Sequence, residues 1–219
     1  MGDKGPRVSR LAAGAAVMVH VAAVAAYLAV MAASGPDPDR LRPVPIAVAY
    51  AVPAVLALAG LRGRVPLLLA AAIAAGVLAV FPFSVHSFVL APAAVVYAVA
   101  FGRLNTPRHG RGAALAAVAC PLLLVAAFLV LLVQDHPACY EELETGEVVV
   151  DRDPGDITSR SIGPDSDVVV AGCTSDTVVW WEAAASLALS GAGVATGLLS
   201  VPKTTQDSRR EHPHRQGTS

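Results

Sequence analysis

The chain has 219 residues, of which 55% are hydrophobic and only 15% charged, and its mean hydropathy is +0.59. Soluble domains carry about 25% charged residues, so this composition excludes an ordinary water-exposed surface over much of the protein. The formal net charge of −1 excludes a strong overall field that would attract nucleic acid. Together these features predict an integral membrane protein.

Six apolar segments are candidates for membrane helices. About 20 apolar residues, rising about 1.5 Å each, cross the roughly 30 Å hydrocarbon layer of a bilayer. The uncharged run 65–102 would be about 57 Å long as one helix, so we expect it to turn at residues 82–87. The segments are apolar on all faces, whereas barrel strands would alternate apolar and polar residues. The prediction is an all-α bundle of six transmembrane helices at residues 11–33, 44–61, 65–83, 86–102, 113–133 and 179–201.

The basic residues predict which ends of these helices face the cytoplasm. With the amino terminus (residues 1–10) inside, twelve of the 16 lysines and arginines fall in inner segments and four in outer ones. Inner loops of membrane proteins collect such residues, so both termini are expected in the cytoplasm. Arginine greatly exceeds lysine, and alanine and valine dominate, as in high-GC bacterial genes. We therefore expect a bacterial plasma membrane, the inner membrane where there are two.

The first apolar segment has a second interpretation. A basic start followed by small residues at Ala32-Ala33-Ser34 is also typical of a cleaved signal peptide. The segment 11–33 is longer than the 7–15 residues usual for the apolar part of such a peptide, which favours a retained helix. Cleavage would leave five spans and the same orientation of the carboxyl terminus.

Residues 134–178 form the one soluble segment that is large enough to fold. Between Gln134 and Trp180 there are eleven acidic residues and two arginines, a net charge of −9. Valine-rich runs at 148–150, 168–170 and 178–179 are separated by turn formers at 154–156 and 163–166. We expect a small sheet of two or three strands, too small to have a sufficient core of its own.

Cys139 and Cys173 flank this acidic segment. On the predicted topology both lie outside the cell, where disulfides persist. A bridge between them would close a loop of about 34 residues and stabilise the segment by about 3–4 kcal/mol in the chain-entropy model. We therefore predict a Cys139–Cys173 disulfide, with free thiols or a bridge to a partner as the alternatives. Cys120 falls within a membrane helix and is expected to be a small packing residue.

The acidic segment also raises the question of cation binding. Asp151, Asp153 and Asp156 supply oxygen ligands of the kind calcium prefers. The spacing does not fit a twelve-residue EF-hand loop, and we favour a solvated acidic surface. Trp180 and Trp181 open the last membrane segment, where tryptophan acts as an interfacial anchor. Recognition of a ligand by stacking is the alternative role for this pair.

Polar residues within the predicted membrane helices are few. His20 lies near mid-depth, and a neutral imidazole there could bond a carbonyl of a neighbouring helix, Tyr27 or Tyr50. Proton relay is the alternative, whereas bis-histidine haem ligation is disfavoured because His86 is expected at the outer mouth. The last helix carries small residues on one stripe, Ser186, Ser190, Gly193 and Gly197. Such a stripe permits close helix packing, either within the chain or in a homo-oligomer.

No catalytic or metal-binding motif is evident, so we expect a non-enzymatic protein without a cofactor or metal. The expected partners are the lipid bilayer and a protein bound at the outer loop. The tail 202–219 is polar and expected to be disordered. The predicted function is a scaffold or accessory protein that presents its acidic outer loop. The alternative is a transporter or carrier subunit for a hydrophobic or uncharged substrate, which would not need charges within the membrane.

Overall fold

The computed structural model describes residues 5–33, 41–81, 85–105, 111–132, 138–145, 148–151, 168–174 and 177–201. Within these ranges the chain forms six helices and a three-stranded sheet. The helices are α1 (Gly5–Ala33), α2 (Pro43–Leu61), α3 (Pro66–Val80), α4 (Ser87–Leu104), α5 (Arg111–Leu132) and α7 (Trp180–Ser200). The strands are β1 (Ala138–Leu143), β2 (Val148–Asp151) and β3 (Val168–Thr174).

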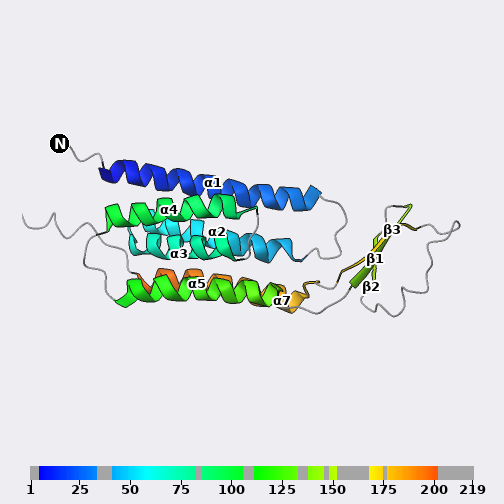
Figure 1. Cartoon of the computed structure of the whole chain (residues 1–219). Coiled ribbons are helices and arrows are strands. Elements are labelled where there is room, and N and C mark those ends of the chain that lie inside the picture. Colours follow the sequence, from blue (N-terminus) through cyan, green and yellow to red (C-terminus); the bar gives the residue numbers. More distant parts are fainter. Residues whose placement is uncertain are drawn as a thin grey trace, which may run out of the picture.

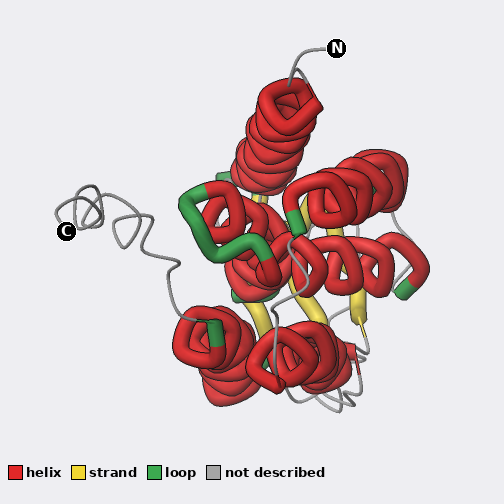
Figure 2. Tube along the Cα trace, turned by 90° about the vertical axis from the view of Figure 1, so that its left-hand side faces the viewer, coloured by secondary structure: helices red, strands yellow, loops and turns green. Residues whose placement is uncertain are grey.

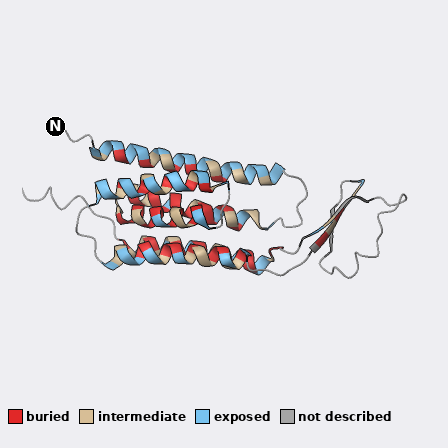
Figure 3. Ribbon diagram, in the orientation of Figure 1, coloured by how far each residue is buried: buried red, intermediate tan, exposed pale blue. Residues whose placement is uncertain are grey.

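The helices pack in three pairs along a common direction (Figures 1 and 2). Helices α2 and α3 form the middle pair, α1 and α4 cover one side of it, and α5 and α7 cover the other. The middle pair is the most buried, because more than half of the residues of each of its helices are buried, as the colouring of Figure 3 shows. Many large apolar side chains of the four flanking helices, α1, α4, α5 and α7, are exposed on the surface of the bundle, as expected for side chains that face lipid.

Five of the six helices are long and apolar enough to cross a membrane, and α3, with 15 residues, is shorter. The predicted segment 65–83 was therefore too long at its carboxyl end. Phe81 leaves the helical conformation, with φ −139° and ψ 122°, and ends α3. The physical reason is Pro82, because the ring of a proline disfavours the helical conformation of the residue before it.

The sheet lies beyond one end of the helical bundle (Figure 1). That end also holds the last turn of α1, the first turn of α2, the last turn of α5 and the start of α7. The start of α1 and the end of α7 lie at the opposite end. The predicted turns at 154–156 and 163–166, the candidate ligands Asp153 and Asp156, and the tail 202–219 lie outside the described residues.

Candidate functional site

The sheet is the part of the molecule that stands apart from the helices. Its strand order is β2-β1-β3, and β1 pairs antiparallel with both neighbours. Two of the predicted valine-rich strands are present, as β2 and within β3. The third valine-rich run, at residues 178–179, forms no strand and leads into α7, and the third strand is β1, which lies in the centre of the sheet. Strand β1, with the sequence ACYEEL, contains few β-favouring residues and is held by its two neighbours.

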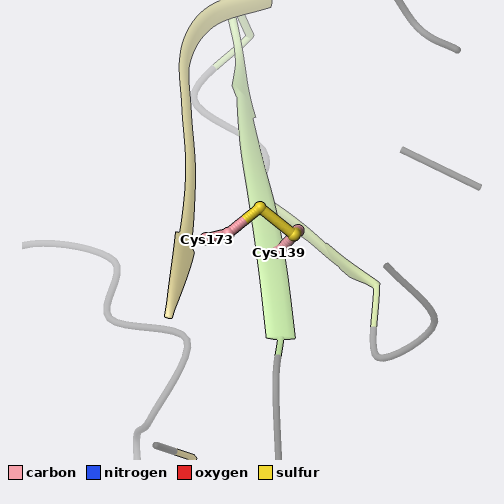
Figure 4. The surroundings of a disulfide bond; sticks show 2 residues. All are labelled: Cys139 and Cys173. Carbon is pink, nitrogen blue, oxygen red and sulfur yellow. A yellow bond between two sulfur atoms is a disulfide. The ribbon is translucent and has the colours of Figure 1, made fainter. Parts of the chain in front are cut away.

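A disulfide joins the central strand to β3 (Figure 4). Cys139 and Cys173 are direct partners in the antiparallel register, with their Cα atoms 4.0 Å apart. This short separation is typical of a pair that exchanges no backbone hydrogen bonds, where side chains on adjacent strands approach each other most closely. The predicted disulfide is thus confirmed, and it spans 34 residues of sequence.

The next pair along the ladder requires a glycine. Tyr140 lies opposite Gly172, and a Cβ added at Gly172 would come within 2.8 Å of Tyr140 Oη and 2.9 Å of the ring. The tyrosine ring therefore lies directly against the backbone of Gly172. An aromatic ring in this position provides the packing that the glycine, which has no side chain, cannot provide. Glu141 follows on the same face of β1 as Cys139, and both side chains are buried.

The junction between sheet and bundle is built by residues 177–182. Thr177 and Val178 are buried, and Val178 packs with Leu131 at the end of α5. This contact fixes the chain where it enters α7. The acidic Glu182 folds back, and its Oε2 accepts a hydrogen bond of 2.9 Å from the backbone N–H of Val179. A carboxylate in the first turn of a helix in this position satisfies a backbone donor and complements the helix dipole.

Trp180 and Trp181 lie in the first turn of α7, at the end of the bundle nearest the sheet. Their side chains are 74% and 52% exposed, so they point outward rather than into the bundle. Their exposure leaves both indole rings free to lie at a membrane–water interface.

His20 contacts the middle pair of helices. Its Nε2 lies 2.8 Å from the carbonyl oxygen of Tyr50, three residues before Pro53 of α2. Because a carbonyl only accepts, the imidazole donates from Nε2 and leaves Nδ1 as an acceptor, which has no partner within the described residues. A proline within a helix disturbs the turn before it, and polar groups of neighbouring helices commonly satisfy the carbonyls there.

An aromatic cluster lies next to this hydrogen bond. The ring of His86 stacks on Tyr50 with centroids 4.5 Å apart and meets Tyr27 edge-on at 5.0 Å. Tyr50 in turn contacts Phe128 edge-on at 5.3 Å. The sequence placed His86 at the outer mouth but predicted no partner for it, and the structure places both histidines against the same tyrosine. Residues of α1, α2, α5 and the turn before α4 thereby meet at one point.

The stripe of small residues on α7 faces the interior of the chain. Ser186, Ser190, Gly193 and Gly197 are all buried. Across the contact with α5, the thiol of Cys120 donates to the carbonyl oxygen of Gly193 at 3.1 Å. A Cβ at Gly197 would lie within 3.4 Å of α2, α3 and α5 side chains. Since these helices cover the stripe, a homo-oligomer would have to use another face of α7.

The described residues contain no group of three or more histidine, cysteine or acidic side chains placed to hold a metal ion. No protein family model, curated protein or solved structure matches this chain. The candidate functional features that the structure defines are the disulfide-closed sheet, its junction with the bundle and the cluster around Tyr50. Sequence reasoning missed strand β1 and the contacts of His86 with Tyr27 and Tyr50, and neither feature has a local signal strong enough to reveal it.

Proposed function

We propose that this chain is a multi-pass plasma-membrane protein that presents its acidic outer sheet to a protein partner, as a non-enzymatic scaffold or accessory subunit. In this proposal all six helices cross the bilayer, both termini lie in the cytoplasm, and the sheet lies outside. The observation that supports it most is the disulfide-closed sheet beyond one end of the bundle. Disulfides persist in oxidising compartments, which fits an outer position for that end.

The short helix α3 fits six crossings because its outer end is recessed. Fifteen residues rise about 22 Å, less than the hydrocarbon thickness of about 30 Å. In Figure 1, on the side of the sheet, the end of α3 and the start of α4 do not reach as far as the end of α1 and the start of α2. Local thinning of the bilayer or water above the recessed turn would accommodate the difference.

The negative charge of the outer segment favours a partner with a basic surface. The segment between Gln134 and Trp180 has a net charge of −9, and a surface of one sign steers and selects partners of the opposite sign. Strand β2 lies at an edge of the sheet, and Val149 on it is exposed. An edge strand of this kind also offers its unpaired backbone groups to a binding segment.

A photo-crosslinking amino acid at Val149 of the full-length protein tests the proposal in intact cells. We expect a discrete crosslinked protein that disappears in the Cys139→Ser/Cys173→Ser variant and weakens when salt is raised, because salt screens charge pairs. The same probe at Phe88, which is exposed on α4, serves as the control and should crosslink only lipid. Identical crosslinks at both positions, or none at Val149, would contradict a recognition role for the sheet.

The alternative of a carrier for a hydrophobic or uncharged substrate predicts a different result. A carrier would lose substrate flux on mutation of bundle residues such as His20 and keep it on removal of the disulfide. Uptake measurements on a His20→Ala variant and on the Cys139→Ser/Cys173→Ser variant therefore separate the two functions.

A further inference from the structure

The end of the bundle opposite the sheet carries a second candidate site, at the turn between α2 and α3. A hollow of about 340 Å³ opens there on the surface between α2 and α7. Its lining combines apolar side chains with two arginines, and consists of Val55, Leu58, Ala59, Leu198, Arg62 and Arg64. An apolar hollow with two guanidinium groups at one end has the chemistry of a site for a molecule with an apolar body and an anionic head.

The turn that carries the two arginines is closed by two backbone hydrogen bonds around Gly63. Gly63 has a φ of +103°, a conformation that glycine adopts without strain. The N–H of Gly63 bonds the carbonyl of Gly60, and the N–H of Arg64 bonds that of Ala59. These two bonds form a Schellman motif, which satisfies the last carbonyls of α2. The sequence Arg-Gly-Arg therefore ends the helix with one arginine on either side of the glycine.

Arg64 is fixed further by the neighbouring helix. One of its terminal nitrogens donates to the carbonyl oxygen of Leu198, near the end of α7, at 2.7 Å. Carbonyls in the last turn of a helix lack partners within the helix, and a cation there is favoured by the helix dipole. The Nε–H of Arg64 is buried and has no partner among the described residues. Arg62 is exposed at the rim of the hollow.

The apolar part of the hollow faces outward from the bundle. Val55 is 44% exposed and Leu58 is 38% exposed, both on the surface of α2 that the other helices leave uncovered. Val55 precedes Arg62 by seven residues, or about 10 Å along the helix axis. In a membrane this places an apolar groove at acyl-chain depth directly below two cations at headgroup depth. Basic pockets between membrane helices on the cytoplasmic side commonly bind anionic headgroups.

We propose that this hollow binds one anionic phospholipid of the inner leaflet, with its phosphate at Arg62 and Arg64 and an acyl chain along Val55 and Leu58. Guanidinium groups pair with phosphate oxygens through two parallel hydrogen bonds, which a single ammonium cannot do. The bound lipid would join α2 to the end of α7, since Arg64 already contacts Leu198. This inference rests on the proposed membrane topology and is independent of the role of the outer sheet.

Native mass spectrometry of the full-length protein in detergent tests the lipid site. Titrated with dioleoyl-phosphatidylglycerol, the protein should retain one lipid at least tenfold more tightly than dioleoyl-phosphatidylcholine. Arg62→Gln should weaken phosphatidylglycerol binding about tenfold, the loss expected for one charge-assisted contact. Arg103→Gln is the matched control, since Arg103 lies in the last turn of α4 at the same end of the bundle and outside the hollow.

A second variant tests the apolar half of the site. Val55→Trp should fill the groove and weaken phosphatidylglycerol binding without unfolding the protein, because Val55 is on the surface. Inorganic phosphate at millimolar concentration should not displace the lipid. The proposal is overturned if phosphatidylcholine binds equally well, if phosphate displaces the lipid, or if Arg103→Gln has the same effect as Arg62→Gln. A folded protein that fails this test would still leave the role of the sheet to be decided by crosslinking at Val149.

Discussion

Replacement of both Cys139 and Cys173 by serine is expected to unfold the outer sheet while the six helices stay folded. The sheet is small, and its extensive contacts are between its own strands rather than with the helices. Three short strands have little core, so they depend on the covalent link. Closing a loop of 34 residues stabilises the sheet by about 3–4 kcal/mol in the chain-entropy model. A loss of that size exceeds what such a sheet can supply from its own contacts.

Hydrogen–deuterium exchange of the full-length protein in detergent measures this effect. Peptides covering β1, β2 and β3 should lose protection in the double variant, while peptides from α2 and α3 should keep it. Cys120→Ser is the control, because Cys120 lies within the bundle, where its thiol on α5 donates a hydrogen bond to the carbonyl oxygen of Gly193 on α7. Unchanged protection of the strands in the double variant would mean that packing alone holds the sheet.

The second large effect is expected at the stripe of α7. Gly197→Leu should lower the free energy of unfolding by about 3 kcal/mol, at the upper end of the range for overpacked cores. A Cβ at Gly197 would lie 3.1 Å from Leu56, 3.2 Å from Cys120 Sγ and 3.4 Å from Leu67. The longer leucine side chain must displace atoms of three different helices, so no single rotamer change relieves the clash.

Gly191 provides a matched control for this substitution. It lies on the same helix, is exposed, and has no atom within 4 Å of an added Cβ. Gly191→Leu should leave the free energy of unfolding unchanged or raise it by up to about 1 kcal/mol, because leucine is the better helix former and meets no clash. Thermal melting of both variants in the same detergent measures the difference. Equal melting temperatures would show that α7 does not pack in the bundle through Gly197.

The helices were predictable from the sequence because each is a long apolar run bounded by charge, glycine or proline. Their ends were less predictable. The extended conformation of Phe81 depends on a single proline, and an apolar count cannot register it. The start of α1 at Gly5 lies within a basic stretch that was assigned to the amino-terminal segment. Helix ends follow local backbone geometry, whereas helix cores follow hydropathy.

The candidate sites were less predictable than the fold. The disulfide followed from two cysteines in one polar segment, and the pairing of Cys139 with Cys173 was the simplest choice. The contact of His20 with a neighbouring helix was predicted, and its hydrogen bond with the carbonyl oxygen of Tyr50 confirms it. The stacking of His86 on Tyr50 and its edge-on contact with Tyr27 were not predictable, because these residues come from segments whose packing order the sequence does not encode locally. The hollow beside Arg64 depends on the approach of α7 to α2, which is a long-range contact of the same kind.

The most direct test of the whole account is the side of the membrane on which the disulfide lies. In right-side-out membrane vesicles, an impermeant reductant followed by an impermeant maleimide should label Cys139 and Cys173. A cysteine introduced by Arg103→Cys should stay unlabelled until the vesicles are opened, because Arg103 lies in the last turn of α4, at the end of the bundle opposite the sheet. Labelling of the introduced cysteine in sealed vesicles, with Cys139 and Cys173 protected, would contradict the proposed topology and with it the outer recognition role of the sheet.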